Sequence, residues 1–186
     1  MQSSPPLRLF WRPSSTGFTL IESMVVLAIV AIIATFAVPS FQATLDQQRV
    51  ATVAADLHAS VVLARAEAIR RNIRIELKPT DGADWARGWQ VVRPVSPTQQ
   101  TEEIIYDRAA APTGVEVLPD PSLAVEASLS YDGTGKSRLA AVPTTAHSGS
   151  WQVSIPNRPA APKRRVVVNM LGRPSVCNPA QPQPPC

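Results

Sequence analysis

A long apolar run lies near the N-terminus of the sequence. From Phe18 to Phe41 nearly every residue is apolar, and the polar exceptions are Thr19, Glu22, Ser23, Thr35 and Ser40. As a helix, the stretch from Phe18 to Val38 would be about 32 Å long, enough to cross the hydrocarbon core of a bilayer. The pattern predicts a transmembrane helix over residues 18–41.

An amphipathic helical pattern follows this run. Apolar residues recur every three or four positions, at Val50, Val53, Leu57, Val61, Ala64 and Ala68. This spacing is typical of a helix that buries one face, and we expect the helix to continue to about Arg71 or Asn72. Pro39 lies between the two halves, and its missing backbone donor predicts a kink there.

The remainder of the chain is patterned as short strands separated by turn signals. The expected strands are Ile73–Leu77, Gly88–Val92, Glu102–Tyr106, Val115–Leu118, Ala124–Tyr131, Trp151–Ile155 and Arg165–Met170. The glycine-containing segment Asp132–Lys136 is interpreted as a turn rather than a phosphate-binding loop. A long helix followed by strands predicts an α+β fold, in which the second half of the helix packs on an antiparallel β-sheet domain.

Charge is distributed unevenly along the 186 residues. The net charge is +4, but residues 133–186 contain bases and no acid. Among these bases, Lys163, Arg164, Arg165 and Arg173 are candidates for binding the phosphates of DNA. The alternative is that bases at the start of a strand keep a sheet edge soluble. We favour this alternative because no aromatic residues alternate with the bases.

The last residues, Pro174 to Cys186, are rich in proline and glutamine and are expected to form an extended tail. Both cysteines of the chain, Cys177 and Cys186, lie in this tail. In an oxidising compartment they are expected to form a disulfide, and the alternative is two free thiols. Because the loop between them is short, a bridge would stabilise the fold modestly.

The sequence gives no sign of an enzyme. Two histidines and two cysteines exclude a multi-ligand zinc cluster. His58 falls within the expected helix and His147 in a loop, and neither belongs to a recognisable catalytic triad. Trp85 and Trp89 are interpreted as core or loop anchors. We therefore expect no catalytic residue, no metal and no cofactor.

The residues that flank the apolar run indicate its orientation and processing. Arg8 and Arg12 precede it, so the N-terminal side should remain in the cytoplasm and the rest should face the periplasm. No small-residue cleavage site follows the run, which ends in Val38–Phe41. An ordinary secretory signal would carry one there. The more natural cleavage point lies before the run, between Gly17 and Phe18.

Glu22 is an acid inside the apolar run. A carboxylate within a membrane helix costs about 2.5–3.5 kcal/mol on the lenient insertion scales. One interpretation places Glu22 at the membrane surface, where water solvates the carboxylate. The other is that the carboxylate awaits a cationic partner.

These residues resemble a known family. Gly17-Phe18-Thr19-Leu20-Ile21-Glu22-Ser23, followed by apolar residues up to Pro39, is similar to the N-terminal signature of type IV prepilins and type II secretion pseudopilins. The segments Ala64–Asn72, Trp85–Val92 and Leu171–Arg173 resemble the GspH/FimT branch, so the resemblance covers Gly17 to about Val176. Members implicated in DNA uptake carry Gly-Arg-x-Arg near the C-terminus. Here the element reads Gly172-Arg173-Pro174-Ser175 and lacks the second arginine.

The resemblance implies a processing pathway and a domain plan. Prepilin peptidase would remove the leader, residues 1–17, and methylate the new Phe18 amine. Residues 18–41 would form the transmembrane and assembly helix, residues 42–173 the pilin-like globular domain with the second half of the helix, and residues 174–186 a proline-rich tail. In a filament, Glu22 would pair with the Phe18 ammonium of a neighbouring subunit, which makes a buried carboxylate tolerable.

The implied function is structural. The protein is expected to be a minor pilin or pseudopilin, anchored by a single pass in the bacterial inner membrane with its C-terminal domain in the periplasm. It would assemble into a type II secretion pseudopilus or a type IV pilus and serve protein secretion or pilus biogenesis. Its expected partners are prepilin peptidase, other major and minor pilins or pseudopilins, and inner-membrane lipid. The alternatives are a pilus-associated DNA receptor for natural transformation and a membrane protein that does not polymerise.

Overall fold

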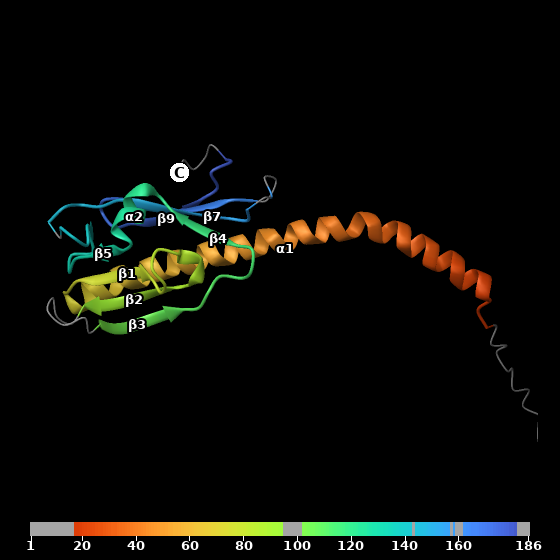
Figure 1. Ribbon diagram of the computed structural model, residues 1–186, viewed down its shortest axis with the longest axis horizontal. Coiled ribbons are helices and arrows are strands. Elements are labelled where there is room, and N and C mark those ends of the chain that lie inside the picture. The colour runs from red at the N-terminus through yellow and green to blue at the C-terminus, as the bar shows by residue number, and fades with distance from the viewer. Residues whose placement is uncertain (1–16, 95–101, 143, 157, 159–161, 182–186) are drawn as a thin grey trace, which may run out of the picture. The chain divides into compact units, whose positions relative to one another are not determined.

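The computed structural model describes residues 17–94, 102–142, 144–156, 158 and 162–181 (Figure 1). Two compact units divide these residues, one ending at Phe41 and one beginning at Gln42. A single helix, α1 (Leu20–Arg71), contributes to both units. The strands, a short 3-10 helix and a second short α-helix all belong to the unit that begins at Gln42, which is called the globular unit below.

Helix α1 begins and ends with recognisable capping groups. Thr19 precedes its first residue, and the Thr19 hydroxyl accepts a hydrogen bond of 3.2 Å from the backbone N–H of Glu22. At the other end Asn72 adopts a left-handed conformation with φ of 52°. The N–H of Ile73 donates back to the carbonyl of Ala68, which together with the left-handed residue forms a Schellman-type end. The predicted end of the helix at Arg71 or Asn72 is confirmed.

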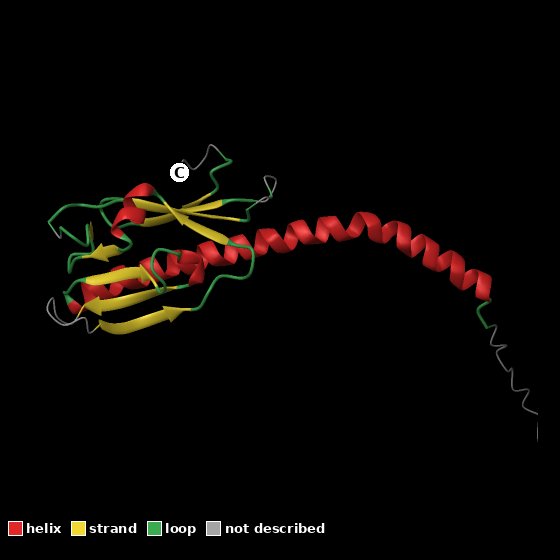
Figure 2. Ribbon diagram, viewed as in Figure 1, coloured by secondary structure: helices red, strands yellow, loops and turns green. Residues whose placement is uncertain are grey.

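In the part of the chain that the structure describes, nine strands form two antiparallel sheets, drawn as arrows in Figure 2. The first sheet has the strand order β3 (Glu102–Arg108), β2 (Trp89–Pro94), β1 (Ile75–Pro79), β5 (Leu129–Tyr131) and β6 (Ser137–Arg138). The second has the order β4 (Glu116–Pro119), β7 (Gly149–Ser154), β8 (Arg164–Val168) and β9 (Pro174–Cys177). The unit also contains two short helical elements, η1 (Trp85–Arg87) and α2 (Pro121–Glu126). The α+β fold predicted from the sequence is confirmed.

The core lies between the second half of α1 and the inner faces of both sheets. All six residues of the predicted apolar stripe, from Val50 to Ala68, are fully buried. Trp85 and Trp89 are also fully buried, which confirms their interpretation as core residues. The Trp85 ring packs edge-on against Trp151 of β7, with the ring centroids 5.0 Å apart, and this aromatic contact joins η1 to the second sheet.

One predicted strand is partly wrong. Ala124–Tyr131 was expected to be a single strand, but its first residues belong to helix α2 and only β5 is a strand. The carboxylate of Asp120 accepts a hydrogen bond of 3.0 Å from the N–H of Leu123, and Pro121 occupies the first helical turn. An Asp cap followed by proline favours a helix start, and this signal outweighs the apolar run.

The expected tail begins later than predicted, because Pro174–Cys177 forms strand β9 of the second sheet. Val176 pairs with Val166 of β8, and Pro174 pairs with Val168. A proline at the first position of an edge strand costs no ladder hydrogen bond, so composition alone did not reveal this strand. The strand also changes the position of β8, which lies inside the sheet rather than at its edge.

Candidate functional site

The predicted cleavage point lies just outside helix α1. Gly17 and Phe18 precede the helix, and the Phe18 side chain is 79% exposed. Among the described residues, a side chain built at Gly17 would meet no atom within 4 Å, so nothing in this part of the fold requires glycine there. A requirement for glycine at this position would then come from the enzyme that recognises the bond.

Thr19 and Glu22 have the spacing of a capping box, T-x-x-E. The Thr19 hydroxyl accepts from the N–H of Glu22, and the Thr19 carbonyl accepts from the N–H of Ser23 at 3.2 Å. Glu22 therefore lies in the first turn of α1, where the helix dipole favours a negative charge. In the part of the chain that the structure describes, Glu22 forms no ion pair, and its carboxylate is free to meet a cation from another molecule.

The first part of α1 exposes large apolar side chains on every face. Within the helix, side chains between 48% and 79% exposed are those of Leu20, Ile21, Met24, Val25, Val26, Leu27, Ile29, Val30, Ile32 and Ile33. A helix that is apolar all round is stable only when lipid or other helices cover it. This segment therefore requires a covering that the described residues of the chain do not supply.

The length and hydropathy of a membrane span are met in α1 only when two of its segments are taken together. Among the described residues, no single helix satisfies the length and hydropathy expected of a membrane span. Leu20–Thr35 and Ser40–Arg71 satisfy them together, by length and composition, across a break between Thr35 and Ser40. Pro39 falls within that break, and a kink at Pro39 stays a prediction.

The structure does not gather the four candidate DNA-binding bases into one patch. Arg164 and Arg165 are consecutive on β8, so their side chains leave opposite faces of the sheet. Arg173 precedes Pro174, which pairs with Val168 at the other end of β8. About 15 Å of strand thus separates Arg173 from Lys163. Among the described residues none of these four bases forms an ion pair with an acid.

The interpretation of these bases as protection for a sheet edge is wrong for β8. Strand β9 pairs along one side of β8 and β7 along the other, so β8 has no free edge to protect. Arg164 and Arg165 of β8 are thus left without this structural role, whereas Arg173 directly precedes β9, the edge strand of the sheet.

The predicted disulfide has one partner in the described residues. Cys177 lies on β9 opposite Arg165 and is 7% exposed. Cys186 lies outside the described residues, so the bridge between Cys177 and Cys186 stays a prediction.

Asp120, Ser122 and His147 meet at the start of α2. The Ser122 hydroxyl donates to Asp120 at 2.6 Å, and His147 Nε2 lies 3.3 Å from the same hydroxyl. In a hydrolytic triad the carboxylate instead bonds the imidazole. Burial raises the pKa of Asp120, but hydrogen bonds from Ser122, Leu123 and Ser150 outweigh it and lower the pKa overall. The carboxylate acts as a helix cap, and the arrangement is structural.

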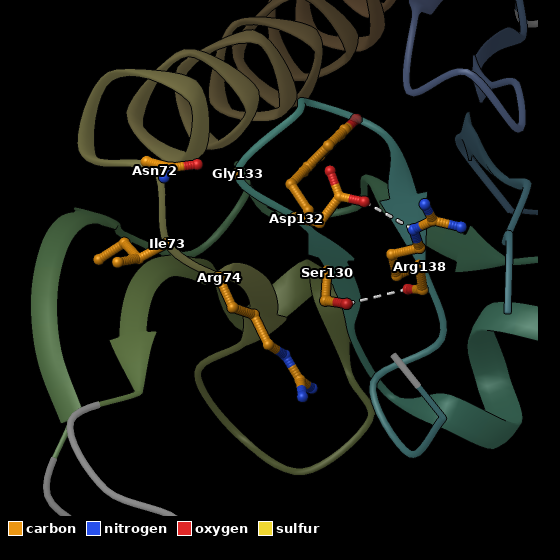
Figure 3. A pocket seen from close by; sticks show the side chains of 8 residues that line it. Asn72, Ile73, Arg74, Ser130, Asp132, Gly133 and Arg138 are labelled. Atoms are coloured by element: carbon orange, nitrogen blue, oxygen red, sulfur yellow. Dashed lines mark hydrogen bonds and ion pairs between the residues drawn. The ribbon is translucent and has the colours of Figure 1, made fainter. Parts of the chain in front are cut away.

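A pocket of about 180 Å³ opens where α1 runs into β1 (Figure 3). It is lined by Asn72, Ile73, Arg74, Ser130, Tyr131, Asp132, Gly133 and Arg138. Its arginines are already occupied: Arg138 Nε contacts Asp132 at 2.7 Å, and Arg74 contacts Glu76 at 2.6 Å. The charges of the pocket are therefore balanced within the chain. Among the described residues no group of three or more His, Cys, Asp or Glu side chains is placed to hold a metal ion.

The Leu171-Gly172-Arg173 element has a clear structural reason for its glycine. Gly172 has a φ of +76°, and a Cβ there would lie 2.3 Å from the carbonyl oxygen of Gly135 and 2.7 Å from the Tyr131 ring. The Tyr131 hydroxyl donates to the Gly172 carbonyl at 3.2 Å, and burial raises the pKa of Tyr131. Gly172 thus lies in close contact with Tyr131 of β5 and with Gly135, in the turn before β6.

The comparisons with known proteins agree with this geometry. The family model described as Type II transport protein GspH matches residues 53–172, and the Prokaryotic N-terminal methylation motif matches residues 12–38. Because the first match covers more than half of the chain, the protein belongs to the GspH family of minor pilins and pseudopilins. A search of curated proteins gives no match.

A solved minor pilin shows the same fold. The type IV minor pilin FimU of Pseudomonas aeruginosa is 14% identical, with a TM-score of 0.58 over 73% of this chain and 96% of that chain. The minor pseudopilin EpsH from the type 2 secretion system of Vibrio cholerae is 11% identical, with a TM-score of 0.49 over 69% of this chain and 95% of that chain. At 14% identity the likeness to FimU shows the pilin-like fold alone.

Proposed function

We propose that this protein is a minor pilin-type subunit that is processed at Gly17 and assembles through the segment that follows. Residues 1–17 are removed as a leader, the Phe18 amine is methylated, and residues 18–41 anchor the chain in the inner membrane. The globular unit then lies in the periplasm. The observation that carries the proposal is the exposed apolar start of α1, which holds an unpaired Glu22 one turn after the cleavage point.

Assembly follows from the charges at the start of α1. Cleavage creates an ammonium at Phe18, and in a filament the Glu22 carboxylate of one subunit meets the Phe18 ammonium of the next. In a low-dielectric environment an unpaired charge is costly and a paired one is tolerated. A subunit out of register would leave both charges unpaired, so the pair fixes the register. Head-to-tail contacts of this kind generate an open helical filament.

The family description favours the secretion pseudopilus over the pilus as the destination. The matching family model is described as a type II transport protein, whereas the likeness to FimU concerns the fold. We propose that the subunit serves protein secretion through a type II pseudopilus, with pilus biogenesis as the second candidate. Loss of secreted proteins from the medium of a deletion strain, with surface pili retained, would support the first.

The processing step is tested by the intact mass of the protein extracted from membranes. We expect a mature chain that begins at Phe18 and carries one methyl group. Gly17→Leu should leave the leader attached, while Thr16→Leu, at the second residue before the cleaved bond, should be processed. A mature N-terminus after Pro39 would point to ordinary signal peptidase and would contradict the proposal.

The assembly step is tested with Glu22→Gln. Glutamine retains the shape and the capping-box capacity of glutamate, so helix α1 should still begin at the same residue. Membrane insertion should be equal or better because a charge is removed. Incorporation into filaments, measured by co-purification with the other subunits, should fall sharply, and Ser23→Ala should serve as the unaffected control. Normal incorporation of Glu22→Gln would show that the carboxylate is merely interfacial.

A further inference from the structure

Several bases gather at the end of the globular unit where α1 enters it, and the proposed function gives them no role. The buried Asp46 carboxylate contacts two guanidinium groups, that of Arg49 at 3.7 Å and that of Arg158. Asp46 lies about 6 Å along the helix from Gln42, where the unit begins. Because Arg158 belongs to the connection between β7 and β8, this contact places that connection at the entry of α1.

Lys163 and Arg164, at the start of β8, lie at the same end. Arg164 pairs with Val153 near the end of β7, so the connection that contains Arg158 starts and finishes beside this pair. Directly paired residues share a face of the sheet. Since Val153 is a buried core residue, Arg164 lies on the face toward α1. We call Arg49, Arg158, Lys163 and Arg164 the proximal cluster.

The proximal cluster carries more positive charge than nearby acids neutralise. Asp46 serves both Arg49 and Arg158, whose side chains remain 49% and 53% exposed. Within the described part of the chain, Lys163 and Arg164 form no ion pair, and Glu116, opposite Ser154 on β4, is the other acid at this end of the second sheet. The bases outnumber the acids, so this surface attracts an anionic partner.

The first sheet does not share this charge. Strand β1 begins shortly after α1 and runs back toward the start of the unit (Figure 2). Beyond it, Asp81 and Asp84 contact one base, Arg87, at 2.7 and 3.5 Å. Acids outnumber the base there, so the positive charge at this end of the unit lies on the side of the second sheet.

The position of the proximal cluster narrows the class of partner. If residues 18–41 cross the inner membrane, Gln42 emerges at its periplasmic surface, and Asp46 follows about one helical turn later. The cluster is then tethered beside lipid phosphates, and a tether raises the effective concentration of a ligand to about the millimolar range. Duplex DNA offers the same phosphates without the tether, so a few bases bind it only weakly at physiological salt.

We propose that the proximal cluster binds the phosphate groups of anionic phospholipid at the periplasmic surface of the inner membrane, and holds the second sheet against the bilayer before the subunit enters a filament. Each base near an anionic surface strengthens binding about fivefold. The inference rests on the proposed function, because it requires residues 18–41 to cross the membrane. It adds a headgroup site on the globular unit to the lipid contact of the anchor itself.

The test uses the full chain, extracted from membranes and reconstituted into vesicles of phosphatidylethanolamine and phosphatidylglycerol at about three to one. A photo-crosslinking amino acid, p-benzoylphenylalanine, replaces Pro162, which precedes Lys163. In the control chain it replaces Met170, which is 60% exposed at the turn between β8 and β9. We expect adducts of phosphatidylglycerol, measured by intact mass, to be at least about tenfold more abundant with the Pro162 probe. Equal yields would overturn the proposal.

Charge removal tests which residues carry the contact. Lys163→Gln combined with Arg164→Gln should lower the adduct yield of the Pro162 probe at least about tenfold. Lys136→Gln combined with Arg173→Gln is the matched control, since it removes the same charge from two bases that flank the contact between Gly135 and Gly172. This control should leave the yield unchanged. An equal loss in both double variants would assign the effect to net charge and contradict a site at the proximal cluster.

The lipid is tested as the source of the phosphate. Phosphatidylcholine in place of phosphatidylglycerol should lower the yield of lipid adducts by a similar factor, because its headgroup has no net charge. An unchanged yield would show that the probe reports contact with any lipid and would overturn the proposal. Neither inorganic phosphate nor a duplex oligonucleotide at micromolar concentration should compete. Loss of the adduct on adding either one would assign the cluster to that ligand instead.

The proposed function is scored separately in the same samples, from the mature N-terminus and from retention of the chain in membranes washed with alkaline carbonate. A processed and retained chain that gives no adduct at Pro162 defeats the headgroup site alone. A chain that carbonate releases defeats the proposed function and this inference with it.

Discussion

The indole of Trp89 donates a hydrogen bond of 2.8 Å to the hydroxyl of Ser60, and both residues are buried. The contact joins β2 to α1, and Ser60 in turn donates to the carbonyl of Asp56 at 2.9 Å. The Arg108 guanidinium lies over the Trp89 ring, 4.9 Å from its centroid, and contacts Asp56 at 2.7 Å. One turn of the helix is thereby fixed to one end of the first sheet.

Ser60→Ala should destabilise the globular unit by about 1–3 kcal/mol, because it leaves the buried Trp89 N–H without its acceptor. The measurement is urea unfolding, monitored by tryptophan fluorescence, of the fragment from Gln42 onward. This fragment contains the hydrophobic core. Ser175→Ala, at an exposed position of β9, is the control and should be neutral within error. An equal loss in both variants would show that the bond between Trp89 and Ser60 contributes nothing.

Gly172→Ala should destabilise the same fragment by more than about 2 kcal/mol, because the new methyl group would collide with backbone as well as adopt a strained φ. Gly114 has a φ of +88° with no atom within 4 Å of an added Cβ. Gly114→Ala therefore reports the conformational cost alone, expected to be about 1 kcal/mol. The thermal unfolding midpoint of Gly172→Ala should be clearly lower than that of Gly114→Ala. Identical midpoints would mean that the contacts around Gly172 adjust to the methyl group at little cost.

Asp132 makes stability depend on pH at the acidic end. Burial raises its pKa, but hydrogen bonds from Thr134, Arg138 and Lys136 outweigh it and bring the pKa to about 2. A folded-state pKa below the unfolded value of 3.8 contributes stability that is complete above about pH 4 and lost as pH falls toward about 2. Asp132→Asn should therefore lower stability by at most about 2 kcal/mol at neutral pH.

The check on Asp132 is the free energy of unfolding of Asp132→Asn and of the natural chain, measured with urea at pH 5, pH 4 and pH 3. The difference between Asp132→Asn and the natural chain should shrink as the carboxylate gains a proton. Asp107→Asn, at an exposed acid of β3 that forms no ion pair within the described residues, is the control. A difference that stays constant with pH would assign the effect to shape rather than to charge.

DNA binding by the fragment from Gln42 onward should be weak and lost near physiological salt. Because Arg164 and Arg165 leave opposite faces of β8 and Arg173 lies at its far end, no more than about two of these bases meet one duplex. The slope of log K against log salt should then be no steeper than about −2. Gel-shift titration at two salt concentrations measures it. Micromolar binding at physiological salt that vanishes on neutralising Lys163, Arg164, Arg165 and Arg173 would instead support a DNA receptor.

The Cys177–Cys186 bridge should be present in protein isolated from the periplasm. We expect no reaction with a thiol-alkylating reagent until a reductant is added, and a loss of about 2 kcal/mol of stability in Cys186→Ser, as for a short closed loop. The double variant Cys177→Ser/Cys186→Ser separates loss of the bridge from exposure of a single thiol. Ready alkylation without a reductant would contradict the prediction.

The sequence by itself determined the features that depend on neighbouring residues. The period of apolar positions located α1 and its buried face from Val50 to Ala68, because a helix returns to the same side every three to four residues. The residues from Gly17 to Ser23 identified the N-terminal signature, since a cleavage site and a helix start are both short and contiguous. Turn residues such as those of Asp132–Lys136 marked the strand boundaries to within a few positions.

Tertiary structure alone decided the features that depend on pairing between distant segments. Pro174–Cys177 became a strand because β8 offered it a partner, a choice that proline-rich composition conceals. The same pairing moved β8 from the edge to the interior of its sheet and set Arg173 at the opposite end from Lys163. The fixed turn that exposes Met170 and Leu171 depends on Ser137 and Tyr131, which lie more than thirty residues earlier. Local patterns cannot register such contacts, because the free energy of a strand depends on the neighbours that the fold provides.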